Sequence, residues 1–231
     1  RTDPACGAKF DAALEKLYRW CLRNDVPIMS HTSISNAPSA DFAALTSAPH
    51  WENLQKEIPG LRVQFGHLGG TNSISTNDTN IRRLLTLMTA DDKSSGQYLY
   101  GDSGYFSEIF QDQSKLRQRL QTLMRSTANK GPAALARRLM YGTDWVMLIA
   151  EGSAHETYLQ AFENSIATLA TDPIINPAGR LVADFFAQNA VDFLGLRRGS
   201  PPRNRLDQFY NARGIAEPTW LKKVDRSLPG S

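Results

Sequence analysis

The sequence predicts an α/β fold in which four parallel strands alternate with helices. Four short apolar runs have the length and composition of buried strands, and the segments between them place apolar residues at the helical period of about 3.6. A strict alternation of the two kinds of segment favours parallel strands joined by right-handed crossovers. Each run also closes on a His or an Asp, at intervals of 36, 35 and 42 residues, which is the length of one strand–helix unit.

The predicted strands are the runs 26–31, 61–67, 97–102 and 139–144. The helix before the second run is expected to begin after Ser47 as its cap, with Pro49 in its first turn. The apolar faces of the predicted helices are formed, in chain order, by Phe10, Leu14, Leu17 and Cys21; by Trp51, Leu54 and Ile58; by Ile81, Leu84, Leu85 and Met88; by Leu116, Leu120, Leu123 and Met124; by Tyr158, Phe162, Ile166 and Leu169; and by Val182, Phe185, Phe186 and Phe193.

Four polar residues, His31, His67, Asp102 and Asp144, close the four runs. The carboxyl ends of parallel strands share one rim, so these side chains are expected to converge there. Any one of them alone is more often a structural hydrogen-bonding group than a ligand. Imidazole and carboxylate groups suit zinc, iron or manganese, and ligands from separate strands leave positions open for water or substrate. The register of all four therefore favours a catalytic metal site, whereas His50 and His155 fall in helical segments outside it.

The composition excludes disordered, fibrous and disulfide-stabilised proteins. The chain has 231 residues, 26 basic and 23 acidic side chains and 41% apolar residues, which is enough for one large core. Its two cysteines, Cys6 and Cys21, form no C-x-x-C pair and indicate neither a thiol zinc site nor a redox pair. No apolar stretch approaches the roughly 18 residues of a membrane span and no secretory pattern opens the chain, so a cytoplasmic protein without a membrane partner is expected.

The chain is expected to divide into a domain over residues 1–196 and a basic, proline-containing tail over residues 197–231. From residue 196 onward eight basic side chains are set against three acidic ones, but prolines and aromatic residues separate them. A tail that packs on the domain is therefore favoured over one that binds nucleic acid. Nucleotide binding is not expected either, because the glycines of 66–70 lack the order of a phosphate-binding loop.

Five segments resemble, in order and spacing, the later half of amidohydrolase-related proteins: VPIMSHT (26–32), PHWENLQKEIPGLRVQFGHLGG (49–70), LYGDSG (99–104), YGTDW (141–145) and FFAQNAVDFLGL (185–196). This family is the branch of the amidohydrolase superfamily that contains metal-dependent hydrolases, lactonases and non-oxidative decarboxylases of small carboxylated or aromatic acids. The resemblance covers residues 10 to about 196. The combination of GHLGG with YGTDW is its most specific part.

The resemblance implies a metal-dependent (β/α)8 barrel whose strands five to eight are the four predicted strands. It implies that His31 and Asp144 bind a divalent metal, zinc or manganese, that His67 polarises water or substrate, and that Asp144 also handles a proton. Asp102 is a candidate substrate contact or a support for its neighbours. The implied reaction is hydrolysis of a lactone or amide by metal-activated water, with decarboxylation of a small acid as the alternative.

The chain departs from the family pattern because it contains no His-x-His, the motif that supplies two metal ligands from the first strand. The remaining ligands are expected to hold a metal weakly or not at all in this chain, and a catalytically silent homologue acting as an interaction domain is a further alternative. Half of a barrel also exposes two strand edges and an apolar inner face. This apolar face is expected to be covered in one of two ways. Either two copies of the chain form a homodimer, or the tail covers the face through Phe209, Tyr210, Trp220 and Leu221.

Overall fold

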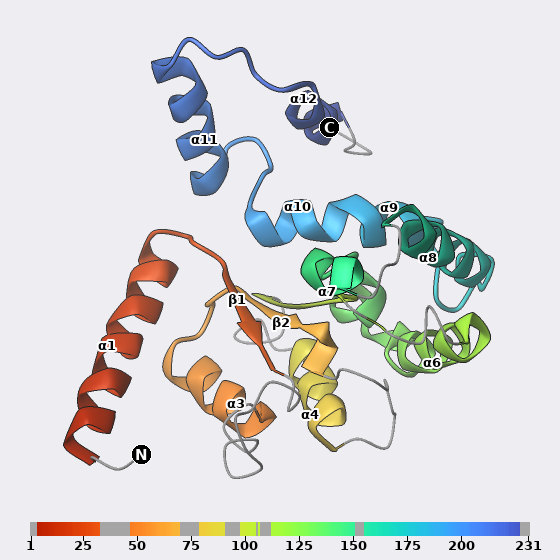
Figure 1. Cartoon of the computed structure of the whole chain (residues 1–231), viewed down its shortest axis with the longest axis horizontal. Coiled ribbons are helices and arrows are strands. Elements are labelled where there is room, and N and C mark those ends of the chain that lie inside the picture. The colour runs from red at the N-terminus through yellow and green to blue at the C-terminus, as the bar shows by residue number, and fades with distance from the viewer. Residues whose placement is uncertain are drawn as a thin grey trace.

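A computed structural model describes residues 4–32, 47–69, 79–90, 98–104, 106, 112–150 and 155–226. At its centre lies one sheet of four parallel strands in the order β1 (Ile28–His31), β2 (Val63–Gly66), β3 (Leu99–Asp102) and β4 (Leu139–Met140) (Figure 1). Within the described ranges this sheet is open, with β1 and β4 at its edges. The predicted α/β fold is confirmed, and four parallel strands in chain order are consistent with a partial (β/α)8 barrel. Gly70, the last residue of the segment 49–70, and Gln97, the first residue of the predicted strand 97–102, lie outside the described residues.

Helices precede, connect and follow the strands. The α-helices are α1 (Pro4–Arg23), α3 (Ala48–Glu57), α4 (Thr79–Met88), α6 (Gln113–Ser126), α7 (Trp145–Ala150), α8 (His155–Leu169), α9 (Leu181–Ala183), α10 (Asn189–Leu194), α11 (Pro201–Ala212) and α12 (Thr219–Arg226). Short 3-10 turns lie at η3 (His67–Gly69), η5 (Ala128–Ala133) and η6 (Leu135–Arg137), and a π-helical turn, η7 (Asp184–Gln188), joins α9 to α10. Ser47 occupies the predicted N-cap position of α3, where Asn80 Oδ1 accepts the Ala48 N–H at 2.7 Å.

The main core lies on one face of the sheet. Alternate strand residues Val63, Phe65, Leu99 and Leu139 are fully buried there with the apolar faces of α4, α6 and α8. The other face carries a smaller cluster in which Tyr100 and Met140 pack against Phe193 of α10. Because side chains alternate along a strand, residues of this second face, Met29, Gln64 and Tyr100, stand level with one another across β1, β2 and β3.

The predicted strand 139–144 is wrong in its second half, because β4 ends at Met140. The Tyr141 N–H donates to the carbonyl of Phe185, 2.9 Å away in η7, instead of to a neighbouring strand. Gly142 then passes close to the end of β3, where a Cβ at this position would lie 3.2 Å from Cβ of Asp102. Asp144 therefore does not close a strand; it directly precedes α7.

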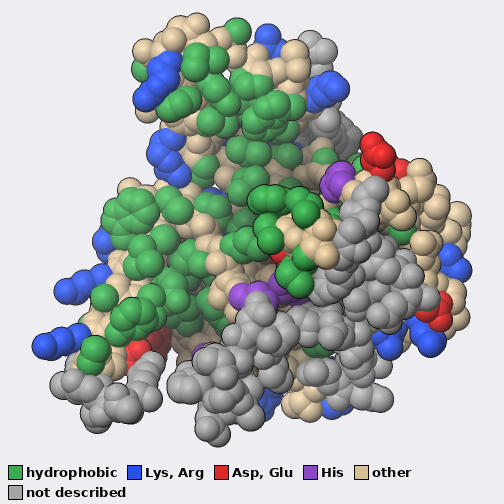
Figure 2. Space-filling model, viewed as in Figure 1, with side chains coloured by type: hydrophobic (Ala, Val, Ile, Leu, Met, Phe, Trp, Pro, Cys, Tyr) green, Lys and Arg blue, Asp and Glu red, His purple; other side chains and the backbone are tan. Residues whose placement is uncertain are grey.

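An apolar surface remains exposed on one face of the molecule. The predicted apolar face of α1 is mostly uncovered: Cys21 is buried, but Phe10 is 64% and Leu17 49% exposed. Figure 2 shows hydrophobic side chains gathered over α1, around α7 and over the C-terminal helices. Exposed apolar residues on these elements and on β1 include Phe10, Leu17, Trp20, Met29, Trp145, Val146, Met147, Ile149, Phe209 and Trp220. A face of this extent is typical of an interaction site.

The region expected as a tail, residues 197–231, forms two helices in its described part, α11 and α12. Ser200 Oγ accepts the Arg203 N–H and two prolines occupy the first turn of α11, which is a standard helix start. The Arg203 guanidinium is fully buried and pairs with Asp207, Glu217 and Asp225, which ties α11 to α12. In this part of the chain Leu221 is buried, whereas Phe209 and Trp220 are about half exposed. None of the helices in the described ranges combines the length and apolarity needed to span a membrane.

Candidate active site

The turn after β2 aims His67 across the ends of the strands. His67, Leu68 and Gly69 all have left-handed backbone, with φ of 56°, 50° and 77°. Non-glycine residues rarely adopt this conformation, so the surroundings must hold it. Leu68 is buried against β3, where a Cβ on Gly101 would come within 2.5 Å of Leu68 Cδ1, and the Thr32 hydroxyl donates to the Gly66 carbonyl at 3.3 Å.

The hydrogen bonds of His67 determine which ring nitrogen is available. Nδ1 lies 2.7 Å from the carbonyl oxygen of Gly104. A carbonyl only accepts hydrogen bonds, so the Nδ1 of a neutral imidazole carries the hydrogen and Nε2 keeps its lone pair. Nε2 faces the Asp144 carboxylate, with Oδ2 3.9 Å away, and the ring packs edge-on against His31 with 4.7 Å between centroids. His31, His67 and Asp144 therefore meet at the carboxyl ends of the strands, as predicted.

Asp144 also has a left-handed backbone. Its φ is 47°, and its carbonyl accepts the N–H groups of Met147 at 2.9 Å and Leu148 at 3.3 Å in the first turn of α7. The backbone is thus fixed by α7 while the side chain turns back to the rim. The carboxylate is 32% exposed, so solvent or a small molecule reaches it.

Asp102 lies beneath the rim and is only 3% exposed. Its Oδ1 accepts the backbone N–H groups of His67 at 3.1 Å and Gly104 at 2.7 Å. Its Oδ2 accepts from Nε2 of Gln64 at 2.6 Å. Both oxygens are thus engaged by the protein, and this geometry favours a support for the neighbouring residues over the expected contact with substrate.

Two residues that the sequence analysis did not select for the site, Tyr158 and Gln64, support the end of β3 and the loop after it. The Tyr158 hydroxyl of α8 donates to the Ser103 carbonyl at 2.5 Å and accepts the Phe106 N–H at 3.2 Å. Burial raises the pKa of Tyr158, so the phenol stays protonated and keeps donating. Gln64 had a readable signal, a polar residue inside an apolar strand, whereas the role of Tyr158 follows only from the packing of α8.

The described residues of the rim do not by themselves form a complete metal site. No group of three or more His, Cys, Asp or Glu side chains in the described ranges is placed to hold a metal ion. The chemistry of His31 and Asp144 suits a divalent metal, but a catalytic site ordinarily draws on at least three protein ligands. The assignment of His31 and Asp144 as metal ligands therefore stays a prediction.

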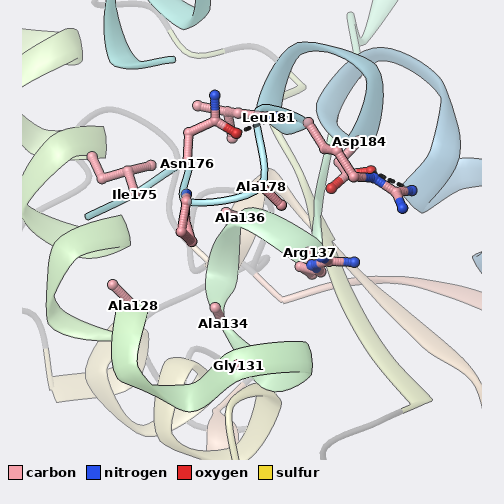
Figure 3. A pocket seen from close by; sticks show the side chains of 12 residues that line it. Ala128, Gly131, Ala134, Ala136, Arg137, Ile175, Asn176, Ala178, Leu181 and Asp184 are labelled. Atoms are coloured by element: carbon pink, nitrogen blue, oxygen red, sulfur yellow. Dashed lines mark hydrogen bonds and ion pairs between the residues drawn. The ribbon is translucent and has the colours of Figure 1, made fainter. Parts of the chain in front are cut away.

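Two cavities lie away from this rim. One, of about 240 Å³, is lined by residues that precede β4, by the loop before α9, and by α9 and η7; Arg137, Asn176, Leu181 and Asp184 are among its lining residues (Figure 3). The other, of about 520 Å³, lies between α4 and α6. The Asp184 carboxylate beside the first cavity forms an ion pair with Arg180 at 3.3 Å. Neither cavity is lined by His31, His67, Asp102 or Asp144.

Comparison with known proteins supports the expectation drawn from the motifs. The family model described as Amidohydrolase matches residues 2–196, which span the whole sheet, the rim and the helices as far as α10. No curated protein and no solved structure matches the chain. Proteins of the amidohydrolase superfamily generally use divalent metal ions, although the described part of this chain shows no metal site. Because the match extends over most of its length, the chain belongs to the amidohydrolase family.

Proposed function

We propose that the chain carries part of the active site of a metal-dependent hydrolase that acts on a lactone, an amide or a small carboxylated or aromatic acid. The observation that carries the proposal is the position of His67 Nε2, which lies 3.9 Å from Oδ2 of Asp144 and beside His31 at the carboxyl ends of the strands. One group offers an imidazole lone pair and the other a carboxylate. General acid–base catalysis of hydrolysis uses groups of these two kinds.

In this proposal Asp144 and His67 act on the same small molecule. Their separation exceeds hydrogen-bonding distance, so neither group satisfies the other and both can turn to a water or a substrate oxygen. Asp144 accepts a proton from the attacking water. His67 Nε2 accepts a hydrogen bond from water or substrate and holds it against the carboxylate.

The metal-binding part of the proposal needs ligands beyond those that the described residues supply. His31 and Asp144 provide two, and the chain has no His-x-His to provide more. We therefore infer that ligands from outside the described residues complete the site, and we derive no chemical step through the metal.

Metal titration tests this assignment directly. Calorimetry with Zn²⁺ and Mn²⁺ on the chain as given is expected to detect weak 1:1 binding, which His31→Ala and Asp144→Asn each weaken by about 10-fold or more. His155→Ala is the matched control, because His155 begins α8 and is not expected to bind the ion. Equal binding by all four proteins would overturn the ligand assignment.

Turnover tests the reaction class. The chain is assayed with lactones, amides and small aromatic carboxylic acids, with Zn²⁺ or Mn²⁺ and with an added polypeptide that carries the first four strands and the His-x-His of an amidohydrolase barrel. Hydrolysis that depends on His67 and Asp144 supports the proposal. Release of CO₂ from the acids alone would replace hydrolysis by decarboxylation, and a complex that binds metal without any turnover would identify a silent homologue.

A further inference from the structure

We propose that Asp102 is a positioning residue, which fixes the tautomer and the orientation of the His67 imidazole. The inference rests on the proposed function, in which His67 Nε2 acts at the rim. Asp102 Oδ1 accepts the His67 N–H at 3.1 Å and the Gly104 N–H at 2.7 Å. The Gly104 carbonyl in turn lies 2.7 Å from His67 Nδ1. Asp102 Oδ1 therefore holds the backbone of His67 and the backbone of Gly104. The His67 ring and the Gly104 carbonyl, which meet at Nδ1, are positioned by these two backbone segments.

The ring of hydrogen bonds explains why His67 can keep a left-handed backbone. With φ at 56°, His67 and the following Leu68 would relax to a more common conformation if nothing held them. The bond from the His67 N–H to a buried, negatively charged acceptor opposes that relaxation. The same carboxylate places the Gly104 carbonyl, which accepts the hydrogen from Nδ1 and leaves the lone pair on Nε2.

Gln64 and Gly142 make this arrangement specific for Asp102. The Gln64 amide donates to Oδ2 at 2.6 Å, so it holds the carboxylate plane with Oδ1 toward the two N–H groups. Gly142 closes over the carboxylate, where an added Cβ would lie 3.2 Å from Oδ1. Because Gly142 covers it and it is only 3% exposed, Asp102 acts on the rim through His67 and Gly104 and does not touch a substrate.

Nitrogen NMR of metal-free, substrate-free protein tests the proposal. In ¹⁵N-histidine-labelled protein near pH 8, where an ordinary imidazole is neutral, His67 is expected as the single tautomer with hydrogen on Nδ1. Its signals are identified by their loss in His67→Gln. Asp102→Ala is expected to give a mixture of both tautomers. Asp207→Asn removes a carboxylate from α11, far along the chain from the rim, and is expected to leave the His67 signals unchanged.

A second pair of variants keeps the test decisive if Asp102→Ala fails to fold. Asp102→Asn retains an oxygen for the two N–H groups, and the Gln64 amide can rotate to present its own oxygen to the new NH₂ group, so the single tautomer is expected to persist. Asp102→Leu has a similar shape but no acceptor, and it is expected to give a mixture of both tautomers. If Asp102→Asn gives a mixture, or if Asp102→Leu keeps the single tautomer in a folded protein, Asp102 does not position His67. Because the readout needs neither metal nor turnover, failure of the proposed reaction would leave it standing.

Discussion

The packing of Leu68 under the His67 turn predicts a strong coupling between positions 68 and 101. Leu68 is 1% exposed, and a Cβ at Gly101 would lie 2.5 Å from its Cδ1 and 3.4 Å from Cε of Met88. Gly101 itself has no left-handed backbone, so an added methyl group meets only side chains. Leucine therefore reaches into the space that glycine leaves open in β3.

Each single substitution is expected to destabilise the chain, and the double substitution is expected to be milder than their sum. Leu68→Ala removes buried methyl groups at a cost of about 2–5 kcal/mol, and Gly101→Ala overpacks the site at a cost of about 1–3 kcal/mol. In the double variant the new methyl group enters the cavity that the leucine leaves. The free energy of unfolding should then lie at least about 1 kcal/mol above the additive value. Alanine keeps a Cβ at position 68, so the strain of the left-handed backbone is the same in all four proteins.

Urea unfolding, followed by far-UV circular dichroism and tryptophan fluorescence, measures the free energy of unfolding of the wild type, the two single variants and the double variant. The denaturant dependence must be equal among the four proteins, since a changed slope would signal a different unfolded or native state. Additivity within about 0.5 kcal/mol would show that positions 68 and 101 do not share space, and the account of the His67 turn would then be wrong.

Two further predictions concern the aromatic core and the exposed apolar face. Burial, with a smaller contribution from Glu163, raises the pKa of Tyr141 from 10.0 to about 12. The unfolded chain ionises first, so the stability that the phenol contributes is complete below about pH 10 and is lost by about pH 12. Tyr141→Phe should flatten the fall of urea stability across that window, and an unchanged slope would contradict this. The apolar face predicts self-association, because burying Phe10 and Leu17 would contribute roughly 1.5–3 kcal/mol each. Light scattering of the wild-type chain should give a mass above that of the monomer, and the double variant Phe10→Ser, Leu17→Ser should lower that mass. A wild-type chain that stays monomeric over a 100-fold range of concentration would refute the prediction.

The sequence predicted the strands and the rim better than it predicted the helix surfaces. β1, β2 and β3 fall inside the predicted runs because buried parallel strands read as continuous apolar segments. The periodicity of α1 located a helix but not its partner, so Phe10 and Leu17 are exposed where burial on the sheet would be the ordinary outcome. The start of α11 was readable from Ser200 and the prolines after it, a signal that the emphasis on charge in the tail overlooked.

The candidate site could be predicted only as far as strand ends determine it. His31 closes β1 as expected, but Asp144 lies four residues beyond β4 and reaches the rim through a left-handed turn. Left-handed backbone at Asp144 and His67 has no sequence signal, because both residue types usually adopt other conformations. The sequence left Asp102 open between a substrate contact and a support for its neighbours, because its partners include two backbone N–H groups whose positions depend on those turns.

The rim depends on two turns as much as on the strands, because His67 and Asp144, which face each other there, both have left-handed backbone. A side chain on a regular strand stands roughly perpendicular to the sheet, which would not bring Nε2 of His67 within 3.9 Å of Asp144. Each turn is held by a different element: β3 holds His67 through Asp102, and the first turn of α7 holds the Asp144 carbonyl. These restraints lie within the described part of this chain. It follows that, in the function proposed above, the chain's own turns already hold His67 and Asp144 opposite each other, and a bound metal ion would add to a geometry that these turns have set.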